Sequence, residues 1–328
     1  MRFLGIQFKI NDGDLNGNFH SHVEKFFKES KPGDILVFPE DVGLLTAFSG
    51  VKGKSISEGI QELYSSNQEK IEAIMRDQGL DNLITGIFLA MTEKFVNDFF
   101  DLFSSLSREY GVYSVTCNNM ARFERRGGKL KIAGRFVYNT AFVFNPKGNL
   151  IFQQDKVFLT QMEKDLGISP GDISRVSTFN LEGREMGIAI SLDAFTPGYI
   201  SRLEGAEIVM QPDANPVKWN SFLENGRWQP EEWMESAYYI AQRTDRTKFV
   251  INPMMVGDLL DVRFEGQSSI TKKAEDSDTK MSYVGNIPST GFHSILSAGG
   301  YSPNEYLPRE SIRNIELRLD EGMVELEI

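Results

Sequence analysis

The chain has 328 residues, of which 41% are hydrophobic and 25% are charged, as in an ordinary globular protein. Its 46 acidic and 35 basic residues give a net charge of −11, which repels phosphate backbones and anionic headgroups. We therefore expect neither nucleic-acid nor membrane binding, and no apolar run approaches the roughly 20 residues that a membrane span needs. The N-terminal residues turn polar too soon for a signal peptide.

Cysteine and histidine are scarce, which limits several kinds of chemistry. Cys117 is the single cysteine, so no intrachain disulfide is possible, and this fits a cytoplasmic protein. The three histidines are His20, His22 and His293. His20 and His22 lie two apart in a segment with helical periodicity, where they do not share a face. We expect both to be surface residues, and we expect no metal and no cofactor.

Strand-like and helix-like segments alternate along most of the chain, which predicts an α/β fold. The expected strands are residues 1–10, 34–38, 83–91, 112–117, 138–144, 150–153, 187–190, 207–211 and 249–251. The expected helices are residues 19–30, 58–78, 93–110, 199–203 and 231–243.

A single domain over residues 1–328 is the simplest organisation, with a divergent region at 271–310. Residues 271–280 are charged and lack apolar anchors, so they predict a loop, and 299–308 are irregular. The last 18 residues form two alternating segments around 320–322, which predicts a hairpin or an edge pair.

Four polar residues lie at or near the ends of strand-like runs: Glu40, Lys156, Glu163 and Ser191. Ligands collect at the carboxyl ends of strands in open α/β sheets, so these side chains could share one pocket. Each also has a plainer explanation. Glu40 could cap a helix, Lys156 could be a solvated loop residue, Glu163 could lie in an exposed turn, and Ser191 could end its strand.

The sequence around these residues resembles the nitrilase superfamily of carbon–nitrogen hydrolases. The ordered stretches are LVFPED, YNTAFVFNPKGNLIFQQDKVFLTQME, GIAISLD, GAEIVMQPDANP, FVINPMMVG and FEGQSSI. The resemblance runs from residue 1 to about 270. It implies a four-layer αββα sandwich of two mixed sheets with helices outside, and a homodimer or higher homo-oligomer paired through outer helices.

The resemblance also implies a function and a role for each residue. Glu40 would be the general base, Lys156 would stabilise the oxyanion, and Glu163 would orient Lys156 and the substrate. Asp193 and Asn215 would bind substrate. The substrate would be a small molecule with a non-peptide amide, N-carbamoyl or nitrile C–N bond, attacked by a nucleophile to give an acyl-enzyme.

The nucleophile position departs from the family, because Ser191 stands where the family has Cys. An alkanol is far less acidic than a thiol, so Ser191 predicts an inactive or nearly inactive form. Three explanations remain: a laboratory replacement of a natural Cys, a naturally non-catalytic binding or scaffold protein, or a slow serine nucleophile. Phe158, in place of the usual His, and Thr196–Gly198 also depart from the family pattern.

Overall fold

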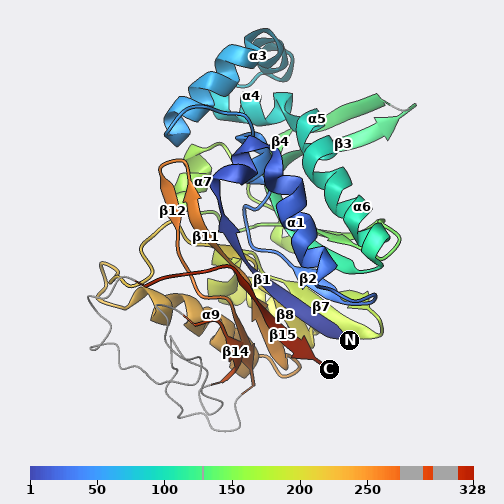
Figure 1. Cartoon of the computed structure of the whole chain (residues 1–328), viewed down its shortest axis with the longest axis vertical. Coiled ribbons are helices and arrows are strands. Elements are labelled where there is room, and N and C mark those ends of the chain that lie inside the picture. The colour runs from blue at the N-terminus through green and yellow to red at the C-terminus, as the bar shows by residue number, and fades with distance from the viewer. Residues whose placement is uncertain (128, 274–290, 298–316) are drawn as a thin grey trace.

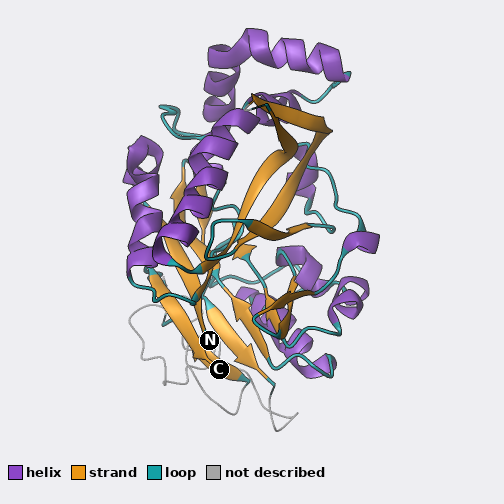
Figure 2. Ribbon diagram, turned by 90° about the vertical axis from the view of Figure 1, so that its right-hand side faces the viewer, coloured by secondary structure: helices purple, strands orange, loops and turns teal. Residues whose placement is uncertain are grey.

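The computed structural model describes residues 1–127, 129–273, 291–297 and 317–328. Two mixed β-sheets pack face to face and helices cover their outer faces, as Figures 1 and 2 show. This four-layer αββα sandwich is the predicted fold. The division into a single domain over the whole chain stays a prediction.

Within the described residues, the first sheet has nine strands in the order β12-β11-β1-β2-β3-β4-β5, with β15 paired to β1 and β9 paired to β11. Its strands are β1 (Arg2–Ile10), β2 (Ile35–Val37), β3 (Tyr113–Arg126), β4 (Lys129–Phe144), β5 (Leu150–Asp155), β9 (Asp213–Ala214), β11 (Met254–Leu259), β12 (Val262–Phe264) and β15 (Gly322–Glu327). The β1, β2 and β3 strands are parallel, whereas β3, β4 and β5 are antiparallel.

The second sheet has six described strands in the order β14-β13-β10-β8-β7-β6. They are β6 (Phe179–Leu181), β7 (Arg184–Ile188), β8 (Ile208–Met210), β10 (Phe249–Asn252), β13 (Ser269–Lys272) and β14 (Phe292–Ile295). The parallel order β7-β8-β10 forms its centre.

The described α-helices are α1 (Phe19–Lys28), α2 (Leu44–Ala47), α3 (Ile56–Gln78), α4 (Leu83–Ala90), α5 (Thr92–Phe95), α6 (Asp101–Tyr110), α7 (Gln161–Asp165), α8 (Pro197–Ile200) and α9 (Gln229–Arg243). Among them, none combines the length and the apolar composition that crossing a membrane requires. The 3-10 segment η4 (Ser191–Phe195) follows β7.

Alternation of side chains along the strands explains the layers. In β2, Ile35 and Val37 enter the core between the two sheets, whereas Leu36 faces the core under the outer helices. In the second sheet, Ile188 packs between the sheets, and the following Ala189 packs in the core that includes α9 residues. Strands that are buried on both faces read as continuous apolar runs, as GIAI does.

An aromatic cluster joins the outer helices α1 and α6 to the first sheet. The ring centroid of Phe103 lies 5.0 Å from that of Phe38 and 5.0 Å from that of Phe99. Phe27 lies 6.2 Å away. All four side chains are fully buried. This packing fixes the helices against the strand that leads to Glu40.

The predicted strand at residues 83–91 is wrong, because these residues form the helix α4. The Asn82 side chain accepts a hydrogen bond from the Thr85 backbone N–H at 3.0 Å, which caps the helix. Residues 85–90 are buried, so the helix is apolar on all sides and shows no amphipathic period. A short apolar run of this kind cannot be told from a buried strand by its periodicity.

The prediction of two surface histidines holds for His20 and is wrong for His22. His20 is exposed, but the His22 side chain is 9% exposed and lies between Asp14 and Glu321. Burial lowers its pKa, but the hydrogen bonds to the two carboxylates outweigh this effect and raise the pKa to about 9. The second carboxylate comes from the other end of the chain, so no local pattern indicated it.

The predicted features of the C-terminal third lie partly outside the described residues. Of the region 271–310, the structure describes 271–273 and 291–297. The first of the two final segments includes residues 311–316, which also lie outside. The second segment is β15, which pairs antiparallel with β1 in a register that joins Arg2 to Glu327.

We expect the replacement Phe103→Ala to lower the free energy of unfolding by about 3–5 kcal/mol, because it leaves a cavity in the aromatic cluster. The control is Phe136→Ala, since Phe136 is 47% exposed and its loss should change stability by less than about 0.5 kcal/mol. Urea denaturation measures both. Equal effects of the two replacements would contradict the described packing.

Candidate active site

Loops that follow strands of both sheets meet at one cavity of about 410 Å³. Glu40 follows β2, Lys156 follows β5, and Ser191 follows β7 as the first residue of η4. These three residues, together with Glu163 and Asn215, line the cavity. The structure therefore brings together five of the six residues predicted from the sequence, whereas Asp193 is not among the residues that line the cavity.

An ammonium group between two carboxylates occupies the polar end of the cavity. The Lys156 Nζ atom lies 2.7 Å from Glu40 Oε1 and 2.9 Å from Glu163 Oε2. Lys156 and Glu40 are almost completely buried. Burial lowers the pKa of Lys156, but the two carboxylates outweigh it and raise the pKa above its usual range, so the ammonium stays charged. Burial raises the pKa of Glu40, which makes it a stronger base.

Uncharged groups also donate hydrogen bonds to the Glu40 and Glu163 carboxylates. The Asn139 side-chain amide donates to Glu40 at 2.7 Å and to Glu163 at 3.2 Å. Glu163 also accepts the Thr160 backbone N–H at 2.8 Å, while the Thr160 hydroxyl accepts the Glu163 N–H, which forms a capping box at the start of α7. Glu163 is therefore held by the first turn of α7, and does not lie in an exposed turn.

Ser191 has a left-handed backbone conformation with φ of 48°, which is rare for a residue other than glycine. Its backbone N–H donates to the Pro212 carbonyl at 3.1 Å, and its side chain is buried at the cavity wall. Backbone strain of this kind often accompanies functional sites.

Asp193 joins the Ser191 segment to the Lys156 segment. Its carboxylate accepts the backbone N–H groups of Val157 at 3.1 Å and Phe158 at 2.8 Å. Burial raises the pKa of Asp193 to about 8, against the effect of these hydrogen bonds. Because its carboxylate binds the backbone that follows Lys156, Asp193 ties the loop after β7 to the loop after β5. Its predicted contact with substrate stays a prediction.

The Asn215 side chain is fixed by three hydrogen bonds. Its side-chain amide donates to the carbonyls of Val217 at 2.9 Å and Glu265 at 3.0 Å, and its oxygen accepts from Gln229 at 3.1 Å. It lines the cavity, as predicted for a residue that binds substrate, but that role is untested.

Sequence reasoning missed two polar groups that support the site. Asn139 belongs to the quoted YNT stretch, so a polar residue inside a buried strand was the available signal. Asp213 is fully buried next to Pro212, where it accepts hydrogen bonds from Gln211 at 3.0 Å and Asn252 at 2.5 Å. In the sequence, Asp213 could be noticed only as an acidic residue within the quoted QPDANP stretch.

Cys117 is not positioned as an alternative nucleophile. Its side chain is fully buried in the core between the sheets, and burial raises the pKa of its thiol well above the usual value. The thiol therefore stays protonated and away from the cavity. In the part of the chain that the structure describes, no group of three or more His, Cys, Asp and Glu side chains is arranged to hold a metal ion.

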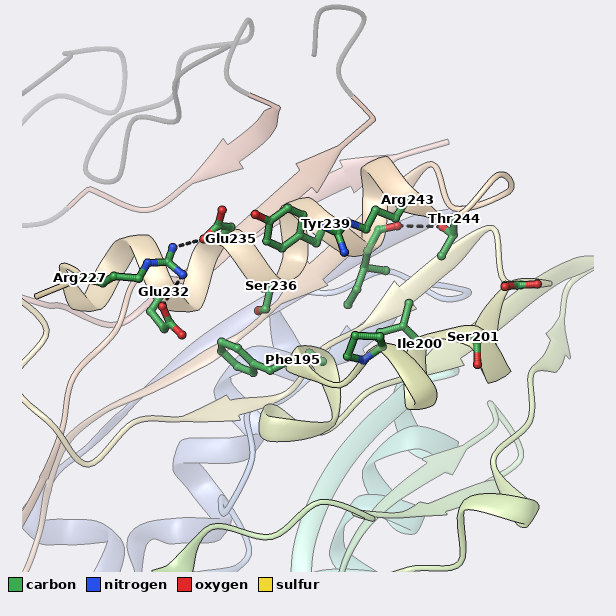
Figure 3. A pocket seen from close by; sticks show the side chains of 14 residues that line it. Phe195, Ile200, Ser201, Arg227, Glu232, Glu235, Ser236, Tyr239, Arg243 and Thr244 are labelled. Atoms are coloured by element: carbon green, nitrogen blue, oxygen red, sulfur yellow. Dashed lines mark hydrogen bonds and ion pairs between the residues drawn. The ribbon is translucent and has the colours of Figure 1, made fainter. Parts of the chain in front are cut away.

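A second hollow of about 410 Å³ lies between α9 and the segment that contains η4 and α8, as Figure 3 shows. The Arg227 guanidinium spans part of it and pairs with Glu235 and, at 2.6 Å, with Glu232. None of the six predicted site residues lines it. Arg243, which also lines it, lies over the Tyr239 ring.

The sequence model of the family described as carbon–nitrogen hydrolase matches residues 83–273, which is more than half of the chain. No curated protein matches the chain.

Among solved structures, the chain is similar to an amidase from Nesterenkonia sp. AN1. An acrylamide adduct of that amidase at its active-site cysteine is 12% identical, with a TM-score of 0.59 over 100% of this chain and 93% of that one. A Cys-to-Ser variant, described as a nitrilase-superfamily amidase, is 13% identical, with a TM-score of 0.58 over 100% and 91%. A butyramide complex is 14% identical, with a TM-score of 0.55 over 90% and 87%.

We expect Asp213→Asn to make stability less dependent on pH. Burial, followed by the charge of Glu40, raises the pKa of Asp213 well above its unfolded value of about 3.9. The folded protein therefore holds a proton that the unfolded chain loses, so this group makes stability fall as pH rises from about 4 toward the folded pKa. Asparagine resembles the neutral acid and removes that loss.

The measurement is urea denaturation of both proteins between about pH 5 and pH 8. The variant should gain at least about 1 kcal/mol relative to the unaltered protein across this range. Asp77→Asn on the exposed face of α3 serves as the charge-matched control. If the stability difference between Asp213→Asn and the unaltered protein were constant with pH, Asp213 would not be a buried neutral acid.

Proposed function

Because the chain belongs to the carbon–nitrogen hydrolase family, we propose that its cavity is the site of an amide-type hydrolase with Ser191 in the nucleophile position. The observation that carries this proposal is the buried Glu40–Lys156–Glu163 cluster in the same cavity as the Ser191 segment. The substrate would be a small molecule with a non-peptide amide, N-carbamoyl or nitrile carbon.

The proposed reaction follows from the charges of these groups. Glu40 takes the proton of the Ser191 hydroxyl as the oxygen attacks the substrate carbon, and the Lys156 ammonium stabilises the oxyanion that develops. With an amide or N-carbamoyl substrate, the C–N bond then breaks, and the proton passes from Glu40 to the leaving nitrogen. Water attacks the resulting ester with Glu40 again as base, which releases the acid and restores Ser191.

Ser191 makes the first step slow. A thiol ionises near pH 8.5, whereas an alkanol is far less acidic, and a single carboxylate is poorly matched to its proton. The smaller oxygen also lengthens the attack distance in a cavity shaped for sulfur. We infer that the chain with Ser191 turns over very slowly or not at all. The alternative is a naturally non-catalytic protein that uses the same cavity for binding.

We expect Ser191→Cys to raise the hydrolysis of simple primary amides by at least about 100-fold, because it supplies an acidic and correctly sized nucleophile. Release of ammonia from propanamide and butanamide measures the reaction, and nitriles and N-carbamoyl amines extend the series. Adding Glu40→Gln to Ser191→Cys should lower the rate of hydrolysis about 10²–10⁴-fold relative to Ser191→Cys alone.

Two controls make the result specific. Cys117→Ser added to Ser191→Cys should leave the new activity unchanged, since Cys117 lies in the core between the sheets. Circular dichroism checks that each variant is folded. A folded Ser191→Cys protein that stays silent on all three substrate classes would refute the hydrolase proposal and favour the binding protein.

Cellular location and assembly stay predictions from the sequence. We propose a cytoplasmic protein that forms a homodimer or a higher homo-oligomer. Light scattering of the purified chain measures the second property directly, and a monomer at all concentrations would refute it.

A further inference from the structure

The cavity has a polar end and a much larger apolar end. Glu40, Lys156 and Glu163 form the polar end, whereas the helices α3 and α4 supply much of the apolar wall. Ile60 of α3 and Ile87 of α4 are among the side chains that line it. Figure 1 shows α3 at the top of the molecule, with α4 below it.

The α3–α4 wall is built into the fold. The Ser55 hydroxyl caps α3 by accepting the Glu58 N–H at 3.1 Å, and Asp261 accepts the Ile56 N–H at 2.7 Å. Gly86 of α4 lies so close to α3 that a Cβ atom there would be 2.7 Å from Met75 Cγ. This close packing holds the two helices in a fixed position relative to each other.

The apolar end offers no partner for a charged ligand. Among the described residues that line the cavity, Lys156 is the single cation, and its ammonium is already shared by two carboxylates. Glu232 is paired with Arg227 at 2.6 Å. Asp41, which also lines the cavity, accepts a hydrogen bond from the Asn119 side-chain amide at 3.0 Å, and burial raises its pKa well above the usual range. A second carboxylate on the substrate would be desolvated here without a free cation, and an ammonium would find Asp41 and Glu232 already engaged, so burying either charge costs several kcal/mol.

We propose that the substrate is an uncharged primary amide with a long aliphatic or an aromatic group, which lies against α3 and α4 while the amide meets Ser191. A cavity of about 410 Å³ lies within the range that buries small organic ligands. This inference rests on the proposed function for the orientation of the amide, but its test is binding and does not require turnover.

The test titrates the unaltered chain with linear primary amides by calorimetry. Each added methylene should tighten binding about threefold, so octanamide should bind on the order of 100-fold more tightly than butanamide. The same chain with a terminal carboxylate, 8-amino-8-oxooctanoate, should lose this gain. Equal affinities along the series, or equal affinities of octanamide and its carboxylate analogue, would overturn the proposal.

A pair of variants locates the apolar group. Ile60→Glu adds a carboxylate at the cavity wall and should weaken octanamide at least 10-fold with little effect on butanamide. Gln61→Glu adds the same charge at the next, exposed position and should change neither affinity. Loss of octanamide binding in both variants, or in neither, would contradict the site. The series on the unaltered chain stays decisive if Ile60→Glu fails to fold.

The two proposals fail in different ways. Binding that rises with chain length, combined with a silent Ser191→Cys protein, would support the apolar ligand and refute the hydrolase. Turnover of butanamide by Ser191→Cys, combined with flat binding along the series, would support the hydrolase and refute the apolar ligand.

Discussion

The site depends on the burial of one ammonium group between two carboxylates. Lys156 contacts both Glu40 and Glu163, and the three charges lie where water is largely excluded. Removing one partner of such a buried cluster leaves an uncompensated charge, at a typical cost of about 3–5 kcal/mol. The Asn139 amide and the Thr160 backbone N–H offset the remaining negative charge of the carboxylates. Three separate loops are therefore held together by electrostatics as well as by packing.

This arrangement does not depend on which atom stands at residue 191. Ser191 is held by its own backbone, through the bond to the Pro212 carbonyl, and Asp193 fixes the η4 segment to Val157 and Phe158. Within the described part of the chain, the hydrogen bonds and ion pairs of the charged cluster join Glu40, Lys156 and Glu163 to one another, to Asn139 and to Thr160, and not to the Ser191 hydroxyl. A change between sulfur and oxygen there alters the chemistry of attack and leaves the frame intact, so an ordered cluster and a weak nucleophile can exist in the same protein.

Local patterns along the chain predicted the α/β class and the polar residues near strand ends, whereas the αββα sandwich and Asn215 were implied by the resemblance to the family. Buried strands appear as apolar runs, and Glu40 and Ser191 come shortly after such runs, whereas Lys156 follows the largely exposed strand β5. The apolar run at residues 83–91 was wrongly predicted as a strand, because α4 is buried on all sides and therefore shows no helical period. It also missed the burial of His22, because Glu321 comes from the far end of the chain. Long-range partners of this kind leave no local signal.

The segment between Glu40 and β3 shows why the substrate is harder to predict than the reaction. The groups proposed to react are few, charged and tied to strand ends, so their spacing in the chain carries information. The wall that would select the substrate is instead made of ordinary apolar residues such as Ile60 and Ile87, which read from the sequence as core. They line a cavity only because α3 packs against α4, which itself packs against β3 and β4, so their role follows from tertiary structure alone.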